Sequence, residues 1–342
     1  MQEVPSLKKS TCRFTALVLA ICLAPGLLAG CDSLGKATET DSIDGPSVAK
    51  TESVDHPSAS QTFTDDLGFE VTVDNPQRVV ACMGSFANIW ELAGGTLTGA
   101  TDDSFEEYGL DGKGIEKVGA FTAPNLERII ALEPDFVIMT GVATGKDGAA
   151  SQVELRGALV ASDIEVAYFT VTTFEDYLRM LRICCDITGR DDLYEQNGTV
   201  IAKQIEDVKA RSASVGKAPT VLLMTTYSGG TRVQNSSTMT GTMLAELGVQ
   251  NLADEFPSLL KDFSLEAVIE ADPDFIFVVP MGNNDAAAMK NLKEATEANP
   301  AWAALDAVQN GRYVILEKEL FLYKPNADWG KSYQKLYNVL YS

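Results

Sequence analysis

Residues 126–138 read LERIIALEPDFVI and residues 265–277 read LEAVIEADPDFIF, so the two stretches align without a gap at a constant offset of 139 residues. Each stretch predicts the same unit, a short helix followed by a Pro-Asp turn and a buried strand. A supersecondary unit that recurs at this distance indicates two similar structural halves. The repeat therefore predicts an α/β protein with two related lobes.

The helix of each repeat copy begins with the same residue types. Asn125 and Ser264 are good N-cap residues. Each is followed by a glutamate at the second helical position, namely Glu127 in the first copy and Glu266 in the second. A favourable interaction with the helix dipole would explain one such glutamate. Because the two glutamates occupy matched positions in the two lobes, we expect them to form a paired docking surface.

The chain from residue 61 onward alternates short β-branched runs with amphipathic helical patterns. Near-continuous apolar strands separated by helices indicate parallel sheets covered on both faces, with ligands bound at the carboxyl ends of the strands. The longest helical stretch, 174–211, breaks near Gly189, and its second piece either bridges two lobes or covers one sheet. The predicted strands are 78–82, 136–139, 166–169, 220–224, 275–279 and 313–316.

The N-terminal segment has the pattern of a targeting sequence. Three basic residues precede an apolar run, 14–28, which is too short for a comfortable membrane span and typical of a secretory signal. The run ends in LAGC at 28–31, which resembles a bacterial lipobox and predicts lipidation of Cys31. An ordinary signal peptide with a chance cysteine, or an N-terminal membrane anchor, is the alternative. Residues 31–61 are rich in Ser, Thr, Asp and Glu and predict a disordered tether.

Composition excludes several classes of function. The chain has 48 acidic and 27 basic residues, a formal net charge of −21, which argues against nucleic acid as a partner. It has one histidine, His56, which disfavours metal sites and catalytic centres built from several imidazoles. After lipobox processing, the remaining cysteines would be Cys82, Cys184 and Cys185, so no disulfide framework is expected.

One acidic segment stands out among the candidate catalytic or metal-binding residues. Asp102, Asp103, Glu106 and Glu107 would suit a hard cation if they formed a carboxylate cluster. We interpret them instead as a solvated loop, because charge runs usually face water. The rival functional hypothesis is an extracytoplasmic α/β enzyme, such as a hydrolase or a chelatase, that uses cleft carboxylates. It needs a nucleophile and a base in mutual reach, and no pair stands out.

Four further motifs carry a family resemblance through their order and spacing. With the lipobox, the tether and the repeat, they resemble the substrate-binding lipoproteins of bacterial ABC importers, specifically the cluster that handles ferric siderophores, haem and cobalamin. The motifs are NPQRVV at 75–80, VGAF at 118–121 running into NLE at 125–127, SLE at 264–266 with PD at 273–274, and NGRYV at 310–314.

The resemblance implies an α/β fold with two Rossmann-like lobes, joined by a long rigid helix, and a ligand cleft between them. It implies that Glu127 and Glu266 pair with arginines of the permease. The histidines of related zinc- and manganese-binding proteins are lacking, which disfavours a bare metal ion. The expected organisation is a signal peptide (1–30), a lipidated tether (31–61), an N-terminal lobe (62–172), a helical bridge (173–213) and a C-terminal lobe (214–342).

The same resemblance implies a non-enzymatic function outside the cytoplasm. We expect a lipid-anchored, monomeric solute-binding protein on the extracytoplasmic face of the cell membrane. It would capture an iron complex (a siderophore or haem) or a corrinoid and deliver it to an ABC permease and its ATPase, with no cofactor and no catalytic residue. Since no proline interrupts 174–211, we expect a largely preformed cleft that closes only slightly around its ligand.

Candidate ligand contacts follow the ends of the predicted strands. Arg232 is the most telling, since a base in a Gly-rich strand-to-helix loop of so acidic a chain would anchor a carboxylate, catecholate or phosphate. An exposed loop arginine is the alternative, and Arg182 and Lys324 are weaker candidates. Core packing is the alternative for every apolar contact. The other candidates are Met83, Ser85, Phe86, Phe121, Thr122, Thr140, Gly141, Tyr227, Ser228, Met239 and Met281, with Phe321 and Tyr323 as an aromatic wall.

Overall fold

The computed structural model describes residues 60–142, 151–261 and 263–341. The predicted signal peptide, Cys31, His56 and almost all of the predicted tether lie outside the described residues. Gln61, the last residue assigned to the tether, is the first residue of strand β1 (Gln61–Thr64). Among the described residues, none of the helices combines the length and the apolar character needed to cross a membrane.

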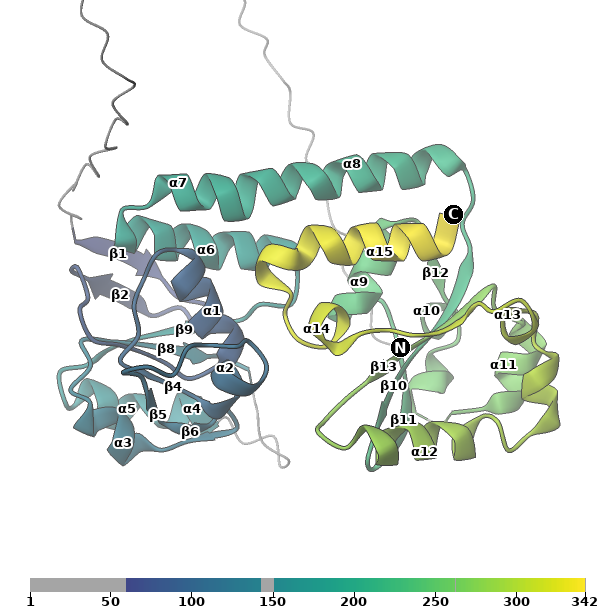
Figure 1. Ribbon diagram of the computed structural model, residues 1–342, viewed down its shortest axis with the longest axis horizontal. Coiled ribbons are helices and arrows are strands. Elements are labelled where there is room, and N and C mark those ends of the chain that lie inside the picture. The colour runs from purple at the N-terminus through teal and green to yellow at the C-terminus, as the bar shows by residue number, and fades with distance from the viewer. Residues whose placement is uncertain (1–59, 143–150, 262, 342) are drawn as a thin grey trace, which may run out of the picture. The chain divides into compact units, whose positions relative to one another are not determined.

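The N-terminal lobe contains a five-stranded sheet in which all strands are parallel (Figure 1). The sheet order is β5 (Glu116–Lys117), β4 (Gly99–Ala100), β3 (Val79–Ala81), β8 (Phe136–Thr140) and β9 (Glu165–Phe169). Every residue of β3 and β8 is buried, as expected for strands covered on both faces. The helices of this lobe are α1 (Gly84–Leu92), α2 (Asp102–Glu106), α3 (Leu126–Ala131), α4 (Ser151–Glu154), α5 (Arg156–Val160) and α6 (Phe174–Thr188).

The C-terminal lobe contains a mostly parallel sheet with one antiparallel edge. Its order is β11 (Gly230–Gln234), β10 (Thr220–Tyr227), β13 (Phe275–Pro280) and β14 (Tyr313–Ile315), and β12 (Gln250–Asn251) also pairs with β10. Strand β11 is antiparallel to β10, whereas the other pairs are parallel. Its helices include α9 (Met239–Glu246), α10 (Leu252–Glu255), α11 (Leu265–Ala271), α12 (Asp285–Ala295), α13 (Asp306–Gln309) and α14 (Lys318–Phe321). The two α/β lobes confirm the predicted fold class.

The sequence repeat is also a repeat of conformation. Helices α3 and α11 begin at the predicted N-caps, whose side chains accept hydrogen bonds from the N–H of Arg128 and of Ala267. Each helix is followed by a residue with positive φ before the proline, Glu133 at 46° and Asp272 at 40°. These left-handed residues, each followed by a proline, stop the helix and turn the chain into the buried strand.

The aspartate of each Pro-Asp turn fastens its strand to the neighbouring one. The carboxylate of Asp135 accepts hydrogen bonds from the backbone N–H of Gln77 and Arg78, which lead into β3. The carboxylate of Asp274 accepts from the N–H and hydroxyl of Thr220 at the start of β10. The repeated PD motif therefore aligns β3 with β8 in one lobe and β10 with β13 in the other.

A long helix connects the two lobes. Helix α6 ends at Gly189, whose φ of 68° suits glycine, and it packs against α1 of the N-terminal lobe. The connection itself is the second piece, formed by α7 (Asp191–Tyr194), a π-helical turn (Glu195–Thr199) and α8 (Val200–Val215). Asn197 donates to the carbonyl of Leu92 in the N-terminal lobe. At the other end, Ser212 bonds to the carbonyl of Leu247 in the C-terminal lobe.

A second connection runs back from the C-terminal lobe. The side-chain amide of Asn326 donates to the carbonyl of Ser85 and to the side-chain oxygen of Asn88, both at 2.9 Å, so this segment is tied to α1. The ring of Trp329 packs edge-on against Phe174 of α6, with ring centroids 5.9 Å apart. Helix α15 (Trp329–Tyr341) then lies alongside α8 (Figure 1). The two lobes are therefore joined twice.

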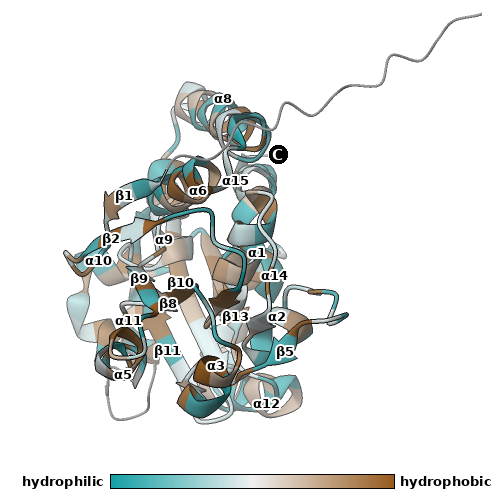
Figure 2. Cartoon of the chain, turned by 90° about the vertical axis from the view of Figure 1, so that its left-hand side faces the viewer, coloured by the Kyte–Doolittle hydropathy of each residue, from teal (hydrophilic) through white to brown (hydrophobic). Residues whose placement is uncertain are grey.

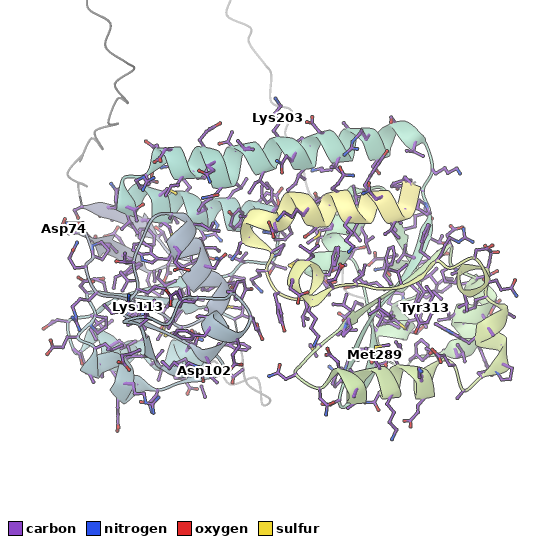
Figure 3. The ribbon with its side chains drawn as sticks, in the orientation of Figure 1. Asp74, Asp102, Lys113, Lys203, Met289 and Tyr313 are labelled. Atoms are coloured by element: carbon purple, nitrogen blue, oxygen red, sulfur yellow. The ribbon has the colours of Figure 1, made fainter. Side chains whose placement is uncertain are left out.

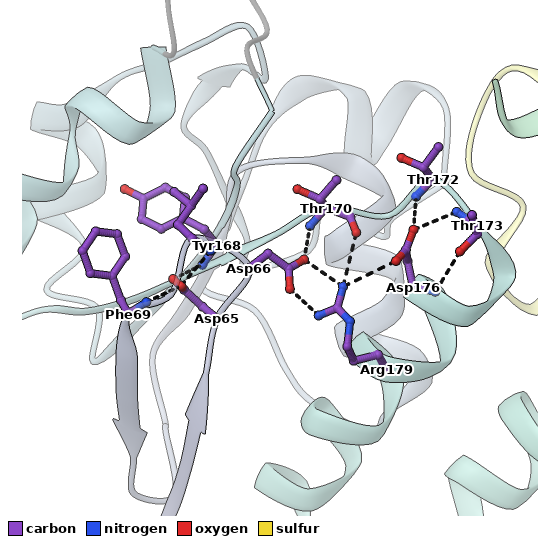
Figure 4. A network of polar contacts seen from close by, with 10 residues as sticks. Asp65, Asp66, Phe69, Tyr168, Thr170, Thr172, Thr173, Asp176 and Arg179 are labelled. Carbon is purple, nitrogen blue, oxygen red and sulfur yellow. Dashed lines mark hydrogen bonds and ion pairs between the residues drawn. The ribbon is translucent and has the colours of Figure 1, made fainter. Parts of the chain in front are cut away.

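The β1–β2 hairpin, in which β2 is Glu70–Val73, is fastened to the edge of the N-terminal lobe by two adjacent aspartates (Figure 4). Asp65 accepts from the N–H of Tyr168 in β9, at 3.0 Å. Asp66 accepts from the N–H of Thr170 and forms an ion pair with Arg179 of α6. These bonds fix the start of the described chain to β9 and α6.

The largest hydrophobic cluster extends through both lobes. It includes Phe86 and Trp90 of α1, Tyr177 of α6, Leu223 of β10 and Trp329 of α15. Two smaller clusters fill the opposite faces of the sheets, one in each lobe. In Figure 2 the strands β8 and β13 are brown, whereas α8 shows both brown and teal faces. The described cysteines, Cys82, Cys184 and Cys185, are free and buried in these clusters.

Candidate ligand-binding site

Two adjoining cavities lie at the carboxyl ends of the strands. The first, of about 480 Å³, is lined by both lobes, and the second, of about 350 Å³, by the C-terminal lobe. Met281 and Leu322 line both. The first also contains Met83, Ser85, Asp102, Asp103, Glu106, Glu107, Tyr108, Ala120, Phe121, Gly282, Asn283, Tyr323 and Lys324, and the second Leu223, Thr225, Tyr227, Arg232, Gln234, Thr238, Met239, Thr240, Val279 and Phe321.

Most of the residues predicted from strand ends come together here. Met83, Ser85, Phe121 and Tyr323 line the first cavity, and Tyr227, Arg232, Met239 and Phe321 line the second. Met281 belongs to both. Lys324, a weaker candidate for the anionic anchor, lines the first cavity. The walls therefore combine aromatic and methionine side chains with two basic groups, a composition typical of small-molecule sites.

Five predicted contacts lie outside both cavities. Phe86 is fully buried in the core, where its ring packs edge-on against Phe169. Thr140 is also buried, and its hydroxyl accepts from the N–H of Val142. Phe86 and Thr140 lie outside the cavities because each side chain lies on the core side of its element. The other three are Thr122 and Ser228, both exposed in turns, and Gly141, which lies near Leu67.

Arg182, the other weaker candidate for the anionic anchor, lies outside both cavities. It stands on α6 and is paired with Asp186 of the same helix and with Asp191. Its ion pairs hold it at the junction between α6 and α7, away from the ends of the strands.

Arg232 stands on a strand, which corrects the prediction of a strand-to-helix loop. It lies in the middle of β11, the second strand of a hairpin with β10. Its guanidinium carbon is 5.1 Å from the ring centroid of Tyr227, a cation–π distance. Arg232 is exposed and forms no ion pair with any described residue. A rigid strand therefore presents an unneutralised cation to the second cavity.

The carboxylates at 102–107 form a wall of the first cavity, which corrects their interpretation as a solvated loop. We call Asp102, Asp103, Glu106 and Glu107 the acidic wall. They lie on or directly after the short helix α2, and Figure 3 labels Asp102 in this part of the lobe. Asp103 is only 9% exposed, because its Oδ2 accepts a hydrogen bond of 2.7 Å from the N–H of Gly84. Gly84 and Asp103 are nineteen residues apart in the sequence, so no local pattern predicts this hydrogen bond.

The other members of the acidic wall differ in their surroundings. Asp102 has a cationic partner, Lys117, at 3.7 Å. Glu106 is exposed, whereas Glu107 is half-buried. Burial, together with the charges of Asp103 and Glu106, raises the pKa of Glu107. The described residues contain no group of three or more His, Cys, Asp or Glu side chains arranged to hold a metal ion.

Lys324 and Tyr108 connect the two sides of the first cavity. The phenol of Tyr108 accepts from the N–H of Lys324 at 3.0 Å and donates to its carbonyl at 3.3 Å. Burial lowers the pKa of the Lys324 ammonium, which forms no ion pair with the described residues. The C-terminal segment is thus fixed to the N-terminal lobe at the cavity itself.

Gln152 is a positioning residue that sequence reasoning missed. It is almost fully buried, and its amide donates to the carbonyls of Phe121, at 2.7 Å, and of Cys82, at 2.8 Å. Its side-chain oxygen accepts from the N–H of Thr140 at 2.9 Å. These bonds hold the turn between β6 (Gly119–Ala120) and β7 (Ala123–Pro124), and with it Phe121, against the strand ends.

The two predicted docking glutamates are both available to a partner. Glu127 stands in the first turn of α3 and Glu266 in the first turn of α11. Both are exposed, and neither forms an ion pair with another described residue. The structure thus leaves both carboxylates free at matched positions of the two lobes.

Comparisons with known proteins agree with this architecture. A family model described as periplasmic binding protein matches residues 79–320. The Fe(3+)-citrate-binding protein YfmC of Bacillus subtilis (strain 168) is 25% identical over 316 residues, which cover 90% of each chain. The ferric-anguibactin-binding protein FatB of Vibrio anguillarum is 22% identical over 283 residues, covering 80% of this chain and 85% of FatB.

The crystal structure of the periplasmic haem-binding protein HutB of Vibrio cholerae matches with a TM-score of 0.62 and 21% identity, covering 78% of this chain and 99% of HutB. This likeness supports the two-lobed fold. The family resemblance found in the sequence motifs is confirmed by the family model, which spans strand β3 to helix α14. Since that match covers most of the sequence and both lobes, the chain belongs to the periplasmic binding protein family.

Proposed function

We propose that the chain is the extracytoplasmic, monomeric solute-binding component of an ABC importer, and that it captures an iron complex or a corrinoid in the two adjoining cavities. The observation that carries this proposal is a cleft at the strand ends that both lobes line. Family membership favours solute binding over the enzyme hypothesis. Relatives named for binding ferric citrate, ferric anguibactin and haem support an iron chelate as the ligand.

The cavity walls suit a compact, partly apolar chelate. Together the two cavities have the dimensions of a small-molecule site. Aromatic and methionine side chains, among them Phe121, Met239, Met281 and Tyr323, provide apolar contact. Arg232 provides a cation for an anionic oxygen of the ligand.

A ligand screen tests the proposed function. The purified full-length chain is heated with ferric hydroxamates, ferric catecholates, ferric citrate, haemin and cobalamins. Because a ligand that binds the folded state stabilises it, at least one should raise the melting temperature in proportion to the logarithm of its concentration. The iron-free chelators serve as controls. If no member of this set raises the melting temperature, the proposed ligand class is wrong.

Arg232→Ala should weaken binding of a ligand that presents an anionic oxygen by about 1.5–3 kcal/mol, the scale of a charge-assisted hydrogen bond. The reason is that Arg232 has no competing ion pair among the described residues. Isothermal titration calorimetry with the best ligand of the screen measures the loss. Lys290→Ala, which removes an exposed base of α12 outside both cavities, is the control and should leave affinity unchanged. Equal affinity in Arg232→Ala would remove the anchor role.

We also propose that Glu127 and Glu266 meet arginines of the permease. Glu127→Ala and Glu266→Ala should each slow uptake while leaving ligand affinity near wild type, because both side chains lie outside the cavities. Ion pairs at an interface rim act mostly on association, so the loss should grow with added salt. Glu70→Ala, at an exposed glutamate of β2, is the control. Normal uptake by the double variant would leave both glutamates as helix-dipole residues.

The lipid anchor belongs to the same proposal. Lipidation of Cys31 would keep the protein at the outer face of the membrane, beside its permease. Mass spectrometry of the membrane fraction should then find a lipid-modified Cys31 as the N-terminal residue, and a soluble mature chain with another N-terminus would contradict the anchor.

A further inference from the structure

The second cavity differs in charge from the rest of this acidic chain. Among the described residues that line it, Arg232 is the one charged side chain, and none is Asp or Glu. The chain as a whole has a formal net charge of −21. The charge of the second cavity therefore favours an anionic group of the ligand.

The wall that carries Arg232 is one face of the C-terminal sheet. Side chains alternate between the two faces of a strand, so Leu223, Thr225 and Tyr227 of β10 share one face. All three line the second cavity, together with Arg232 and Gln234 of β11. The register of the hairpin pairs Thr225 with Arg232 and Leu223 with Gln234. Because paired and diagonal side chains on one face lie within reach of one another, Thr225, Arg232 and Gln234 form one continuous surface, which we call the polar patch.

The side chains of the polar patch are not used by the fold. Thr225 and Gln234 are both half-buried, and neither the hydroxyl of Thr225 nor the side-chain amide of Gln234 forms a hydrogen bond to another described residue. Thr226, the next residue of β10, points to the opposite face, where its hydroxyl donates to a carbonyl of α12 at 2.7 Å. Hydrogen-bonding groups on the cavity face of β10 and β11 are therefore available to a molecule in the cavity.

Arg232 is held in position although it has no ion pair. Its guanidinium carbon lies 5.1 Å from the ring centroid of Tyr227. The ring of Tyr227 lies against the turn of the hairpin, since a Cβ at Gly229 would be 2.8 Å from its Cε2 atom. A cation that is positioned by a paired strand and an aromatic ring loses less side-chain freedom when a ligand binds.

We propose that the second cavity binds a carboxylate group of the ligand, with Arg232 as its bidentate partner and Thr225 and Gln234 as further hydrogen-bond donors. The inference rests on the proposed function and names the chemical class of one part of the ligand. A guanidinium presents two parallel N–H groups, which match the two oxygens of a carboxylate. The hydroxyl and the amide add donors for the remaining lone pairs of those oxygens.

A carboxylate fits the polar patch better than other anionic groups do. It carries one negative charge, which one guanidinium neutralises, whereas a phosphate monoester carries about −1.5 to −2 at neutral pH. The oxygens of a catecholate are already bound to the metal in a ferric complex. The first cavity does not select an anion in the same way, because it contains both the acidic wall and Lys324. The carboxylate is therefore expected at the polar patch, with the rest of the chelate toward Met281, which lines both cavities.

Two matched pairs of iron complexes test the inference. N-succinyl-ferrioxamine B and N-acetyl-ferrioxamine B share one ferric trihydroxamate, but the succinyl arm ends in a carboxylate and the acetyl arm is uncharged. Haemin has two propionate carboxylates, and haemin dimethyl ester has none. Equilibrium titrations of the full-length chain are followed by quenching of the protein fluorescence. In whichever pair binds, the carboxylate member should bind about tenfold more tightly or better, the effect of a charge-assisted hydrogen bond.

Three variants assign the preference to the polar patch, and the ratio of affinities within a pair is the readout, so that a general loss of binding affects both members equally. Gln234→Glu places a carboxylate two residues from Arg232 on the same face of β11, so it should reduce the ratio to about one. Thr225→Val removes the hydroxyl and should lower the ratio about threefold, the effect of one neutral hydrogen bond. The control Gln250→Glu makes the same charge change at an exposed position of β12, outside both cavities, and should preserve the ratio.

Equal affinities within each pair in the wild-type chain would overturn the inference, as would a preference that survives Gln234→Glu. The ligand screen judges the proposed function separately. If a ligand without a free carboxylate binds, such as a cobalamin, and none of the four complexes does, the carboxylate subsite is wrong and the solute-binding function stands. If ferric citrate is the best ligand of the screen, Gln234→Glu must weaken its binding about tenfold, or the inference fails. If nothing in the screen binds, both proposals fail.

Discussion

Gly241→Ala should lower the free energy of unfolding by about 2–3 kcal/mol, the upper part of the range for overpacked sites. Gly241 is buried in α9, and a Cβ there would lie 2.1 Å from the carbonyl oxygen of Asn235 and 2.8 Å from the Cα of Ser236. Both contacts are to backbone, so no rotamer change relieves them. Because the residues just before Gly241 line the second cavity, ligand affinity should fall as well.

Gly157→Ala is the matched control for this substitution. Gly157 lies in α5, is exposed, and has no atom within 4 Å of the site that a Cβ would occupy. Alanine is the better helix former, so this variant should be as stable as wild type or gain up to about 1 kcal/mol. Urea unfolding followed by circular dichroism compares the two. Equal stability of Gly241→Ala and wild type would contradict the close packing of α9 on the loop before it.

Asn326→Asp should destabilise the fold by about 2–4 kcal/mol at neutral pH, because it breaks the tie between the C-terminal segment and α1. The side chain of Asn326 is 1% exposed and donates to two acceptors, the carbonyl of Ser85 and the Oδ1 of Asn88. A carboxylate in its place removes both donors and puts a buried charge opposite two acceptors. Calorimetric unfolding measures the loss.

The effect of Asn326→Asp should depend on pH with a defined sign. Burial raises the folded-state pKa of the introduced carboxyl above its unfolded value. Relative to wild type, stability is therefore recovered as the pH falls through the folded pKa toward the unfolded one, and lost again as the pH rises. Asn338→Asp, at an exposed position of α15, makes the same chemical change without burial and should cost less than about 0.5 kcal/mol at either pH. A similar loss in both variants would contradict the tie at Asn326.

The repeat made the fold predictable because its information is local. In each copy an N-cap, a short helix, a proline and a buried strand follow one another within fourteen residues, and the local sequence of each part predicts its conformation. The positive φ at Glu133 and Asp272 has no signal in the sequence, because neither residue is glycine or asparagine and a residue before proline usually adopts extended backbone. The left-handed backbone at these two residues is imposed by the short distance between the end of the helix and the start of the strand.

The sequence predicted those site residues that lie at strand ends. It did not predict the residues whose position depends on contacts with distant parts of the chain. Tyr227 ends the strand β10 and Met281 directly follows the buried strand β13, so their positions in the sequence placed them at the cavities. Asp103 depends on an N–H nineteen residues away, and Gln152 on carbonyls of other turns. A run of carboxylates can face solvent or pack against the start of a distant helix, and the local sequence does not distinguish the two cases. For this reason the acidic wall was interpreted wrongly as a solvated loop.

The double connection between the lobes has a consequence for rates. When a helix and a returning segment already hold the lobes, much of the entropic cost of assembling the cleft is met on folding rather than on binding. Encounter is then governed by diffusion and by the field of the cleft, with no slow closing step in the association rate constant. Ligands should differ mainly in residence time. Release would then depend on the permease separating the lobes, because the ligand would dissociate only slowly from the free protein.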